Sequence, residues 1–282
     1  MTPPFSAVLN DEGTRASFRF FHPKGNILTA EHVVENASSV TVMFQDGSTA
    51  KATVVGTDKS TDTAVIHVDV SSSKLHPLAL GDSSTVQPGQ SVVAIGSPFG
   101  LPETMTAGIV SASSRTITAP NRFSITGAIQ TDAAINHGNS GGPLIDTATN
   151  TVIGINDQIE SDTNDNSGVG FAVPINSARS VAQTLIAGGT VKHAYVGVKI
   201  KDVTNGAQIT TIVKGSPAAK AGLKVGDVVT GFDGTAIKSA DDLTAAVFKS
   251  KSGETVSVTV RRHGATKTLH VTLGVQPTSP SS

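Results

Sequence analysis

The stretch INHGNSGGPL, residues 135–144, surrounds one serine with glycines. Glycine adopts backbone angles that other residues avoid and lets another chain approach closely, at a cost in conformational entropy on folding. Two interpretations of the stretch fit. It is either a tight glycine turn between strands, or a loop in which Ser140 attacks a carbonyl group while the backbone N–H groups of Gly138 and Ser140 hold the developing oxyanion.

A serine hydroxyl is a weak nucleophile unless a base takes its proton and an acid orients that base. His32 lies in GNILTAEHVV, just after a predicted strand and among small and valine side chains. Asp62 lies in STDTAVIHV, directly before a strongly β-forming run; taken alone, such an aspartate is more typical of a turn or a helix cap. The chain order His32, Asp62, Ser140 is that of chymotrypsin-type barrels and differs from the order in other serine hydrolase folds.

Motifs for other chemistries are missing. The chain has no cysteine, which excludes a cysteine nucleophile and a disulfide framework. No histidine has the His-Glu-x-x-His or another zinc-ligand spacing, and no Walker-type Gly-Lys-Ser/Thr occurs, so neither a metal ion nor a cofactor is expected. Six other histidines have the surroundings of surface or strand-edge residues: His22, His67, His76, His193, His263 and His270.

The charge of the chain is divided unevenly. Residues 1–189 hold 9 basic and 16 acidic side chains and residues 190–282 hold 12 and 6, which gives formal charges of −7 and +6. This asymmetry favours two domains. We expect no nucleic-acid partner, because the lysines are scattered and aromatic residues make up only 4% of the chain. The start, MTPPFSAVLNDEG, has no secretory-signal pattern, so either the protein stays where it is made or a leader has been removed.

Short β-branched segments separated by turns recur through the first 175 residues, a rhythm typical of an antiparallel barrel or sandwich. These segments are VTVMF (40–44), AVIHVDV (64–70), SVVAIG (91–96), AGIVSA (107–112) and TVIGIN (151–156). The next segment has helical spacing, with Asn176 as its expected cap and glycines 188 and 189 at its end. Its apolar face would hold Ile175, Ala178, Val181, Ala182, Leu185 and Ile186.

We place the domain boundary after residue 189, with a second domain over residues 190–275 and a disordered tail over 276–282. The second domain has the pattern of several strands and one helix, which Ser239 can cap while Asp241 and Asp242 favour the positive end of its dipole.

Taken together, these motifs resemble those of the HtrA (DegP-like) serine proteases, which carry a PDZ domain after the protease domain. TAEHVV, TDTAVI and GNSGGPL resemble the histidine, aspartate and serine motifs, and IQTDAAIN and GVGFAVP resemble the flanking segments. The resemblance implies a mainly β fold, a trypsin-like double β-barrel followed by a PDZ domain. It also implies ATP-independent cleavage of unfolded polypeptides, as part of protein quality control in the cell envelope.

By the same resemblance, His32 is the general base, Asp62 orients it, Ser140 is the nucleophile, and the oxyanion donors are the Gly138 and Ser140 backbones. A rival hypothesis of another class is a peptide-binding chaperone or scaffold with an idle protease fold. An idle site has no chemical need for an intact His32, Asp62 and Ser140.

The second domain carries its own binding motif. YVGV, comprising Tyr195, Val196, Gly197 and Val198, resembles the loop in which a PDZ domain receives the carboxylate of a peptide C-terminus. GSPAAKAGLKVGDVV (215–229) resembles a signature of the same family, although an ordinary small β-domain is the alternative. The peptide would add as a strand beside residues 198–202 and pack against a helix that contains Leu243, Ala246 and Val247.

Two positions depart from the family pattern. The segment at 16–19 reads Ala-Ser-Phe-Arg where the family usually has Gly-Ser-Gly-Phe, and His137 stands where proline is more common. Phenylalanine is concentrated at the N-terminus, at Phe5, Phe18, Phe20 and Phe21. The last two are adjacent and on a strand would point to opposite faces, so one of them needs cover from outside the barrel. Because HtrA relatives form trimers through aromatic residues near this end, we expect a homotrimer.

Overall fold

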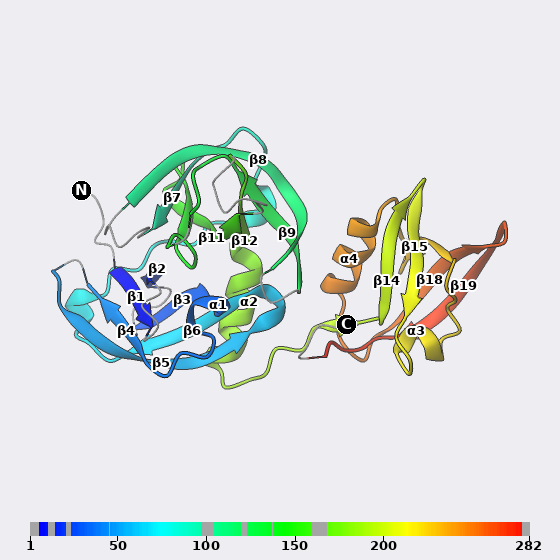
Figure 1. Ribbon diagram of the computed structural model, residues 1–282, viewed down its shortest axis with the longest axis horizontal. Coiled ribbons are helices and arrows are strands. Elements are labelled where there is room, and N and C mark those ends of the chain that lie inside the picture. Colours follow the sequence, from blue (N-terminus) through cyan, green and yellow to red (C-terminus); the bar gives the residue numbers. More distant parts are fainter. Residues whose placement is uncertain are drawn as a thin grey trace. The chain divides into compact units, whose positions relative to one another are not determined.

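The computed structural model describes residues 6–10, 15–20, 24–44, 46–96, 104–119, 123–136, 138–159 and 168–277. The chain folds into two compact units, residues 1–191 and 192–282, which are treated separately below (Figure 1). The mainly β fold predicted from the sequence is confirmed. The expected boundary after residue 189 lies in the coil that follows the helix ending at Ile186.

Six strands of the first unit close into a barrel in the order β1-β2-β3-β6-β5-β4. Its core is formed by β-branched side chains such as Ile27, Val42 and Ile66, all fully buried. The strands are β1 (Ser6–Asn10), β2 (Arg15–Phe20), β3 (Asn26–Ala30), β4 (Val40–Met43), β5 (Thr49–Asp58) and β6 (Thr63–Val68). Two short helices lie at strand ends, α1 (Glu31–Val34) after β3 and the 3-10 turn η1 (Lys59–Thr61) before β6. Both therefore lie at one end of the β3–β6 pair, which positions the site described below.

A second closed barrel follows in the order β10-β11-β12-β9-β8-β7. Val110, Ile129 and Leu144 are fully buried in its core. Its strands are β7 (Ser91–Gly96), β8 (Thr104–Thr118), β9 (Ser124–Thr131), β10 (Pro143–Asp146), β11 (Thr151–Ile159) and β12 (Gly170–Pro174). Along the chain, the 3-10 turns η2 (Ser72–Lys74) and η3 (Ser83–Thr85) connect the last strand of the first barrel to the first strand of the second. The trypsin-like double barrel predicted for this unit is confirmed.

Helix α2 (Ile175–Ile186) packs on both barrels, because its buried face shares one apolar cluster with Leu28 and Val65 of the first and Val173 of the second. Two details of the expected helix are wrong. Pro174, not Asn176, is the N-cap, since Asn176 instead donates to Asp82 Oδ1 at 2.6 Å and to Ser83 Oγ through its backbone N–H. Ile186, in the last turn, is 38% exposed and lies outside the buried face.

The second unit is built on a sheet of order β14-β15-β16-β18-β19, in which β14 is an edge strand. Ser239 caps α4 through a reciprocal capping box with Asp242, as the sequence predicts. The elements are β13 (Ala194–Tyr195), β14 (Val198–Val203), β15 (Gly206–Ile212), α3 (Pro217–Lys220), β16 (Val228–Phe232), β17 (Thr235–Ala236), α4 (Ala240–Lys249), β18 (Thr255–Arg262), β19 (Ala265–Thr272) and β20 (Gly274–Val275).

Some expectations lie outside the described residues. Phe5, Phe21, His137 and the tail from residue 278 are among them, and the side chains of Phe18 and Phe20 are not described although their backbones form part of β2. Among the residues that the structure describes, no helix is both long and apolar enough to cross a membrane.

Candidate active site

His32 and Asp62 are brought together by the pairing of β3 with β6, in which Ala30 lies opposite Thr63. Asp62 uses both carboxylate oxygens on the same histidine. Oδ1 accepts the backbone N–H of His32 at 2.9 Å, and Oδ2 lies 2.6 Å from the ring Nδ1. The carbonyl oxygen of Asp62 also accepts the backbone N–H of Glu31 at 3.1 Å. These three contacts fix the imidazole as a donor at Nδ1 and leave Nε2 as the nitrogen that can accept a proton.

The two groups shift one another's pKa in the directions expected of an ion pair. For His32, burial opposes the charged form, but the hydrogen bond and charge of Asp62 outweigh it, and the pKa is raised above 6.5. For Asp62, burial also opposes the charge, but the hydrogen bond and charge of His32 outweigh it and lower the pKa below 3.8. Glu31, buried beside them, has its pKa raised to about 7 by burial first and then by Glu35 and Asp62.

Ser140 lies on the loop between β9 and β10, within the glycine-rich stretch INHGNSGGPL. Gly138 has a φ of +99° and Gly141 a φ of +78°, a conformation that side chains rarely adopt. The Gly141 N–H donates to the Asn156 carbonyl at 2.7 Å, and the Asn156 N–H donates to Gly142 at 2.7 Å. The loop is thereby held on β11, and the Ser140 hydroxyl donates to the carbonyl oxygen of Asp157 at 2.6 Å.

The same loop presses against the end of β7. Gly96 leaves space for Asn139, whose Oδ1 lies only 1.7 Å from where a Cβ on Gly96 would be. Asn139 is buried and its amide donates to the Ala134 carbonyl at 3.1 Å. The residue before Ser140 is therefore fixed by close packing as well as by hydrogen bonds.

Asp157 is a site residue that the sequence did not identify as one. From the sequence, an acid at this position could point into the substrate pocket and favour cleavage after basic side chains. Its carboxyl group is instead fully buried, with Oδ1 3.9 Å from Nδ1 of His32. The available signal was a single charged residue in a predicted strand, and a one-dimensional pattern does not show which way it turns.

One nitrogen and two carboxylate oxygens of His32, Asp62 and Asp157 lie within 4.8 Å of one another, as metal ligands do. The atoms of His32 and Asp62 are too close for that purpose, because a tetrahedral ion about 2.1 Å from each would hold them about 3.4 Å apart. Their separation of 2.6 Å is that of a charge-assisted hydrogen bond.

The YVGV loop of the second unit has a defined backbone orientation. The Val196 carbonyl accepts from Ala218 N–H at 2.9 Å, and the Gly197 carbonyl accepts from Val213 N–H at 2.9 Å. Because C=O and N–H point in opposite directions across a trans peptide, the N–H groups of Gly197 and Val198 point away from these internal partners. Gly197 has a φ of +83°, and a Cβ there would lie 2.3 Å from the Cβ of Ser216.

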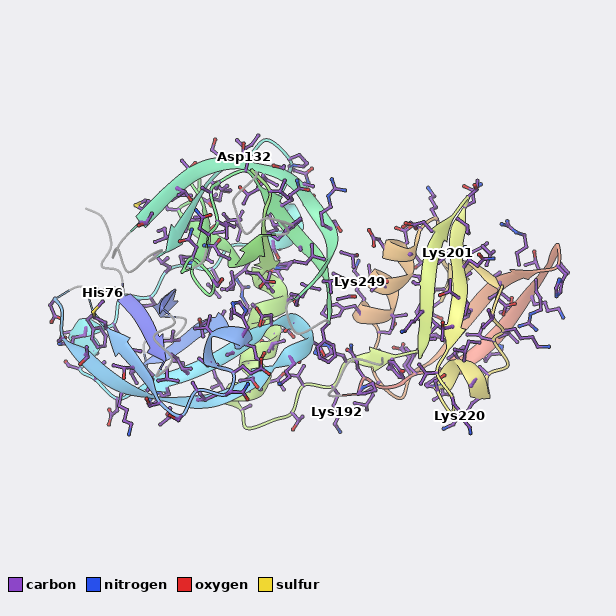
Figure 2. All side chains as sticks on the ribbon, in the orientation of Figure 1. His76, Asp132, Lys192, Lys201, Lys220 and Lys249 are labelled. Carbon is purple, nitrogen blue, oxygen red and sulfur yellow. The ribbon has the colours of Figure 1, made fainter. Side chains whose placement is uncertain are left out.

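The loop leads into the edge strand β14, whose Val198 and Ile200 pack partly buried on the same core as Ala246 and Val247 of α4. Tyr195, the remaining residue of the motif, pairs with Gly274 in the small β13–β20 sheet. Figure 2 shows Lys201 on β14 and Lys249 at the end of α4, and both are exposed.

Comparisons with known proteins agree with this architecture. A family described as a trypsin-like peptidase domain matches residues 19–155, and one described as a PDZ domain matches residues 194–273. A probable periplasmic serine endoprotease, DegP-like, from Marinomonas sp. (strain MWYL1) is 41% identical over 268 residues, which cover 91% of this chain and 56% of the relative. Serine protease PepD of Mycobacterium tuberculosis is 43% identical over 275 residues, covering 89% and 59%. The chain thus spans about half the length of the curated relatives it matches.

Solved structures match over more of their length. The HtrA-type protease AlgW with a tripeptide superimposes with a TM-score of 0.84 at 33% identity, over 97% of this chain and 93% of that one. The serine endoprotease from Yersinia pestis gives a TM-score of 0.75 at 31% identity, over 97% and 94%. With a trypsin-like double barrel, a following PDZ domain and these relatives, the chain belongs to the HtrA-type family of serine proteases.

Proposed function

We propose that this protein is an ATP-independent serine endopeptidase that cleaves unfolded or misfolded polypeptides. His32 acts as the general base, Asp62 orients it, and Ser140 is the nucleophile. The backbone N–H groups of Gly138 and Ser140 bind the oxyanion. Because its DegP-like relatives are named as periplasmic endoproteases, we propose that the protein acts in the cell envelope, in the periplasm or outside the cell.

The chemistry follows from the positions of the protons. Asp62 keeps the proton of the imidazole on Nδ1, so that Nε2 of His32 can take the proton of Ser140 as the hydroxyl attacks a peptide carbonyl. Attack requires the Ser140 hydroxyl to turn from the Asp157 carbonyl toward Nε2. The resulting imidazolium is stabilised by Asp62 and returns its proton to the leaving amine. Each oxyanion donor supplies roughly 3 to 4 kcal/mol of transition-state stabilisation.

One observation carries the proposal. Asp62 holds both the backbone and the ring of His32, and Ser140 bonds the residue whose carboxyl group lies beside that ring. A histidine with no role beyond the surface would not need a buried carboxylate partner. A serine in an ordinary turn would not need a loop held by hydrogen bonds to β11 and by packing against β7.

The test is covalent labelling with a fluorophosphonate, which reacts with an activated serine. We expect the protein to be labelled and to cleave casein, and we expect Ser140→Ala to lose both properties while keeping its unfolding transition, because the substitution removes one oxygen and no core contact. A protein that folds, binds unfolded polypeptide and resists labelling would instead be an idle chaperone or scaffold.

We further propose that the second unit binds peptide C-termini. The N–H groups of Gly197 and Val198 would receive the terminal carboxylate, and the peptide would add as a strand to the edge of β14, in the groove beside α4. The basic side chains of this unit favour an anionic ligand and would mainly increase its association rate.

Fluorescence anisotropy with matched free-acid and amidated peptides tests this binding. Gly197→Ala should abolish binding, because its Cβ would collide with Ser216, whereas Gly234→Ala should retain it. Gly234 has an equally left-handed φ of +79° but no atom within 4 Å of its Cβ position, so it controls for backbone strain alone. Equal affinity for the free and amidated peptides would contradict carboxylate recognition.

A further inference from the structure

Asp157 contributes to the site through its backbone carbonyl, but the mechanism above leaves its carboxyl group without a role. On β12, Ala172 lies opposite Asn156 and Phe171 lies opposite Gln158, so Asp157 is an extra residue in β11. Such β-bulges re-aim a side chain and release its backbone from the ladder. The bulge gives the Asp157 carbonyl to the Ser140 hydroxyl and turns the carboxyl group toward His32 and Asp62.

Among the described residues, no donor satisfies this carboxyl group. Both oxygens of Asp157 are buried and lack a hydrogen-bond partner in the ionised form. Nδ1 of His32 lies 3.9 Å from Asp157 Oδ1, and its proton is already donated to Asp62 Oδ2, which lies 2.6 Å from Nδ1. The group within hydrogen-bonding reach is the Asp62 carboxylate, which is also an acceptor. A hydrogen bond between two carboxyl groups requires a proton on one of them.

Charges around the pair do not compensate for a second anion. The groups whose charge acts on Asp157 are Asp62 and His32. Glu31, next to His32 on α1, adds negative charge to the same cluster, and Lys59 lies 3.9 Å from Glu31 Oε1 and bonds Glu35. His32 is thus the one cationic group facing two carboxylates among the residues that the structure describes.

In the described part of the chain, the remaining elements that pack on β11 carry one cation, Arg179 of α2, and it bonds a backbone carbonyl elsewhere. Strands β3 and β12 carry no charged side chain. Arg179 of α2 donates to the Gly81 carbonyl at 2.7 Å, and Asp146 of β10 accepts the Ala148 N–H at 2.8 Å. Two ionised carboxylates in such a place repel one another and are both desolvated. Consistent with this, burial first and Asp62 second raise the pKa of Asp157 well above 3.8.

We propose that Asp157 is a positioning residue that carries a proton at neutral pH and donates it to Asp62, so that one carboxylic acid holds the carboxylate that orients His32. The positioning role rests on the proposed function, whereas the presence of the proton does not. The donated hydrogen bond keeps Asp62 ionised and aimed at Nδ1. Loss of the proton would place a second negative charge beside the histidine and push the two carboxylates apart.

Infrared difference spectroscopy on the full chain tests the proton directly. The spectrum of the wild type minus that of Asp157→Asn should contain the C=O stretch of a protonated carboxylic acid at about pH 7.5, far above the ordinary pKa of aspartate. Glu31→Gln is the matched control, because Glu31 is a buried acid beside the same histidine with a pKa of about 7. Its band should fade across neutral pH while that of Asp157 persists.

A carboxylate band from Asp157 in place of the acid band at this pH would overturn the proposal. If Asp157→Asn fails to fold, the spectrum of Glu31→Gln serves instead, because in that protein we assign a protonated-acid band that persists above neutral pH to Asp157. A Glu31→Gln spectrum without such a band would refute the claim that Asp157 is protonated. This measurement needs no turnover, so an inactive protein would contradict the proposed function and leave the proton test intact.

Kinetics test the positioning role. Asparagine keeps a neutral donor to Asp62, so Asp157→Asn should retain kcat within about threefold. Asp157→Ala should lose about 10- to 100-fold in kcat with little change in KM. That loss corresponds to the removal of one hydrogen bond to a charged group. The acidic limb of the kcat/KM profile, which reports His32, should not move in Asp157→Asn. If Asp157 were ionised, removing its charge would shift that limb down by about one pH unit or more, and the proposal would be wrong.

Discussion

Gly96→Ala separates the positioning of the serine loop from the chemistry of the serine itself. Gly96 is the last residue of β7, and its φ is not left-handed, so alanine suits its backbone and the conflict is steric alone. The added Cβ would lie 1.7 Å from Oδ1, 2.4 Å from Cγ and 2.7 Å from Cα of Asn139. Rotating the Asn139 side chain relieves the first two contacts but not the third, which involves the backbone directly before Ser140.

The required movement sets the expected magnitude. Contacts below 3.0 Å do not persist, so Oδ1 must shift by about 1.3 Å and the Asn139 backbone by at least about 0.3 Å. The bond from Asn139 to Ala134 would be strained as well. Overpacking of this kind costs about 1 to 3 kcal/mol of unfolding free energy. A displacement of about 1 Å at a reacting group costs up to about 100-fold in rate. A backbone shift of about 0.3 Å or more therefore predicts a fall in kcat/KM of about 4- to 100-fold.

Fluorophosphonate labelling and peptide turnover measure the effect, with chemical unfolding as the check on stability. Gly189→Ala is the control, since its φ is also not left-handed and its tightest contacts, with the Thr184 side chain at 3.1 Å and the Thr184 carbonyl oxygen at 3.2 Å, need a shift of only a few tenths of an ångström at an exposed position. That variant should keep its activity. A folded Gly96→Ala protein that labels and cleaves within about twofold of the wild type would refute the argument that packing at β7 positions Ser140.

Three further predictions use separate measurements. Peptide-library profiling should give cleavage after Val, Ala or Ile. The candidate pocket segments are residues 134–140 and 154–173, and the acid in their described part, Asp157, faces His32 and not the pocket. Dominant cleavage after Lys or Arg would overturn this. Light scattering at micromolar concentration should show a homotrimer that weakens when residues 1–21 lose their phenylalanines, each worth roughly 1.5 to 3 kcal/mol when buried; a stable species near 28.7 kDa would contradict it. Denaturant titrations should show that the unfolding free energy of the wild type falls relative to that of Asp157→Asn as pH rises above about 4. The reason is that the native state keeps a proton on Asp157 that the unfolded chain has lost. A difference between the two proteins that stays constant up to about pH 8 would contradict a protonated Asp157.

The fold was largely predictable from the sequence. Short β-branched runs separated by turns marked the barrel strands, and Ser239 with Asp242 predicted the start of α4 through local chemistry alone. The N-cap of α2 was not predictable in the same way. Asn176 has the right side chain for a cap, but Asp82 and Ser83, more than 90 residues earlier, compete for its donors. Local propensity does not contain such a partner.

In the site, too, residues with a local sequence signature were predictable and a residue placed by distant contacts was not. The motifs of His32, Asp62 and Ser140 each have a local signature, and the structure brings the first two into direct contact. Asp157 has none, because its orientation depends on one extra residue in the register between β11 and β12. Strand alternation assigns faces only while the register is regular, and a bulge breaks that rule at the point where the side chain matters.

The bulge also links two properties that are usually separate. The carbonyl of Asp157 holds the resting Ser140 hydroxyl, and its carboxyl group faces the pair that must activate that hydroxyl. A movement of this one residue therefore acts on both the nucleophile and the base. When the proposed proton is lost, repulsion from Asp62 acts on a carboxyl group whose own backbone is outside the ladder, where the sheet resists displacement least. The stability of the wild type relative to Asp157→Asn should therefore fall from about pH 4, where the unfolded chain loses its proton, and level off at the pH at which the native carboxyl group ionises. Activity should fall at that same upper pH, whereas an independent ionisation elsewhere would lower activity at a different pH.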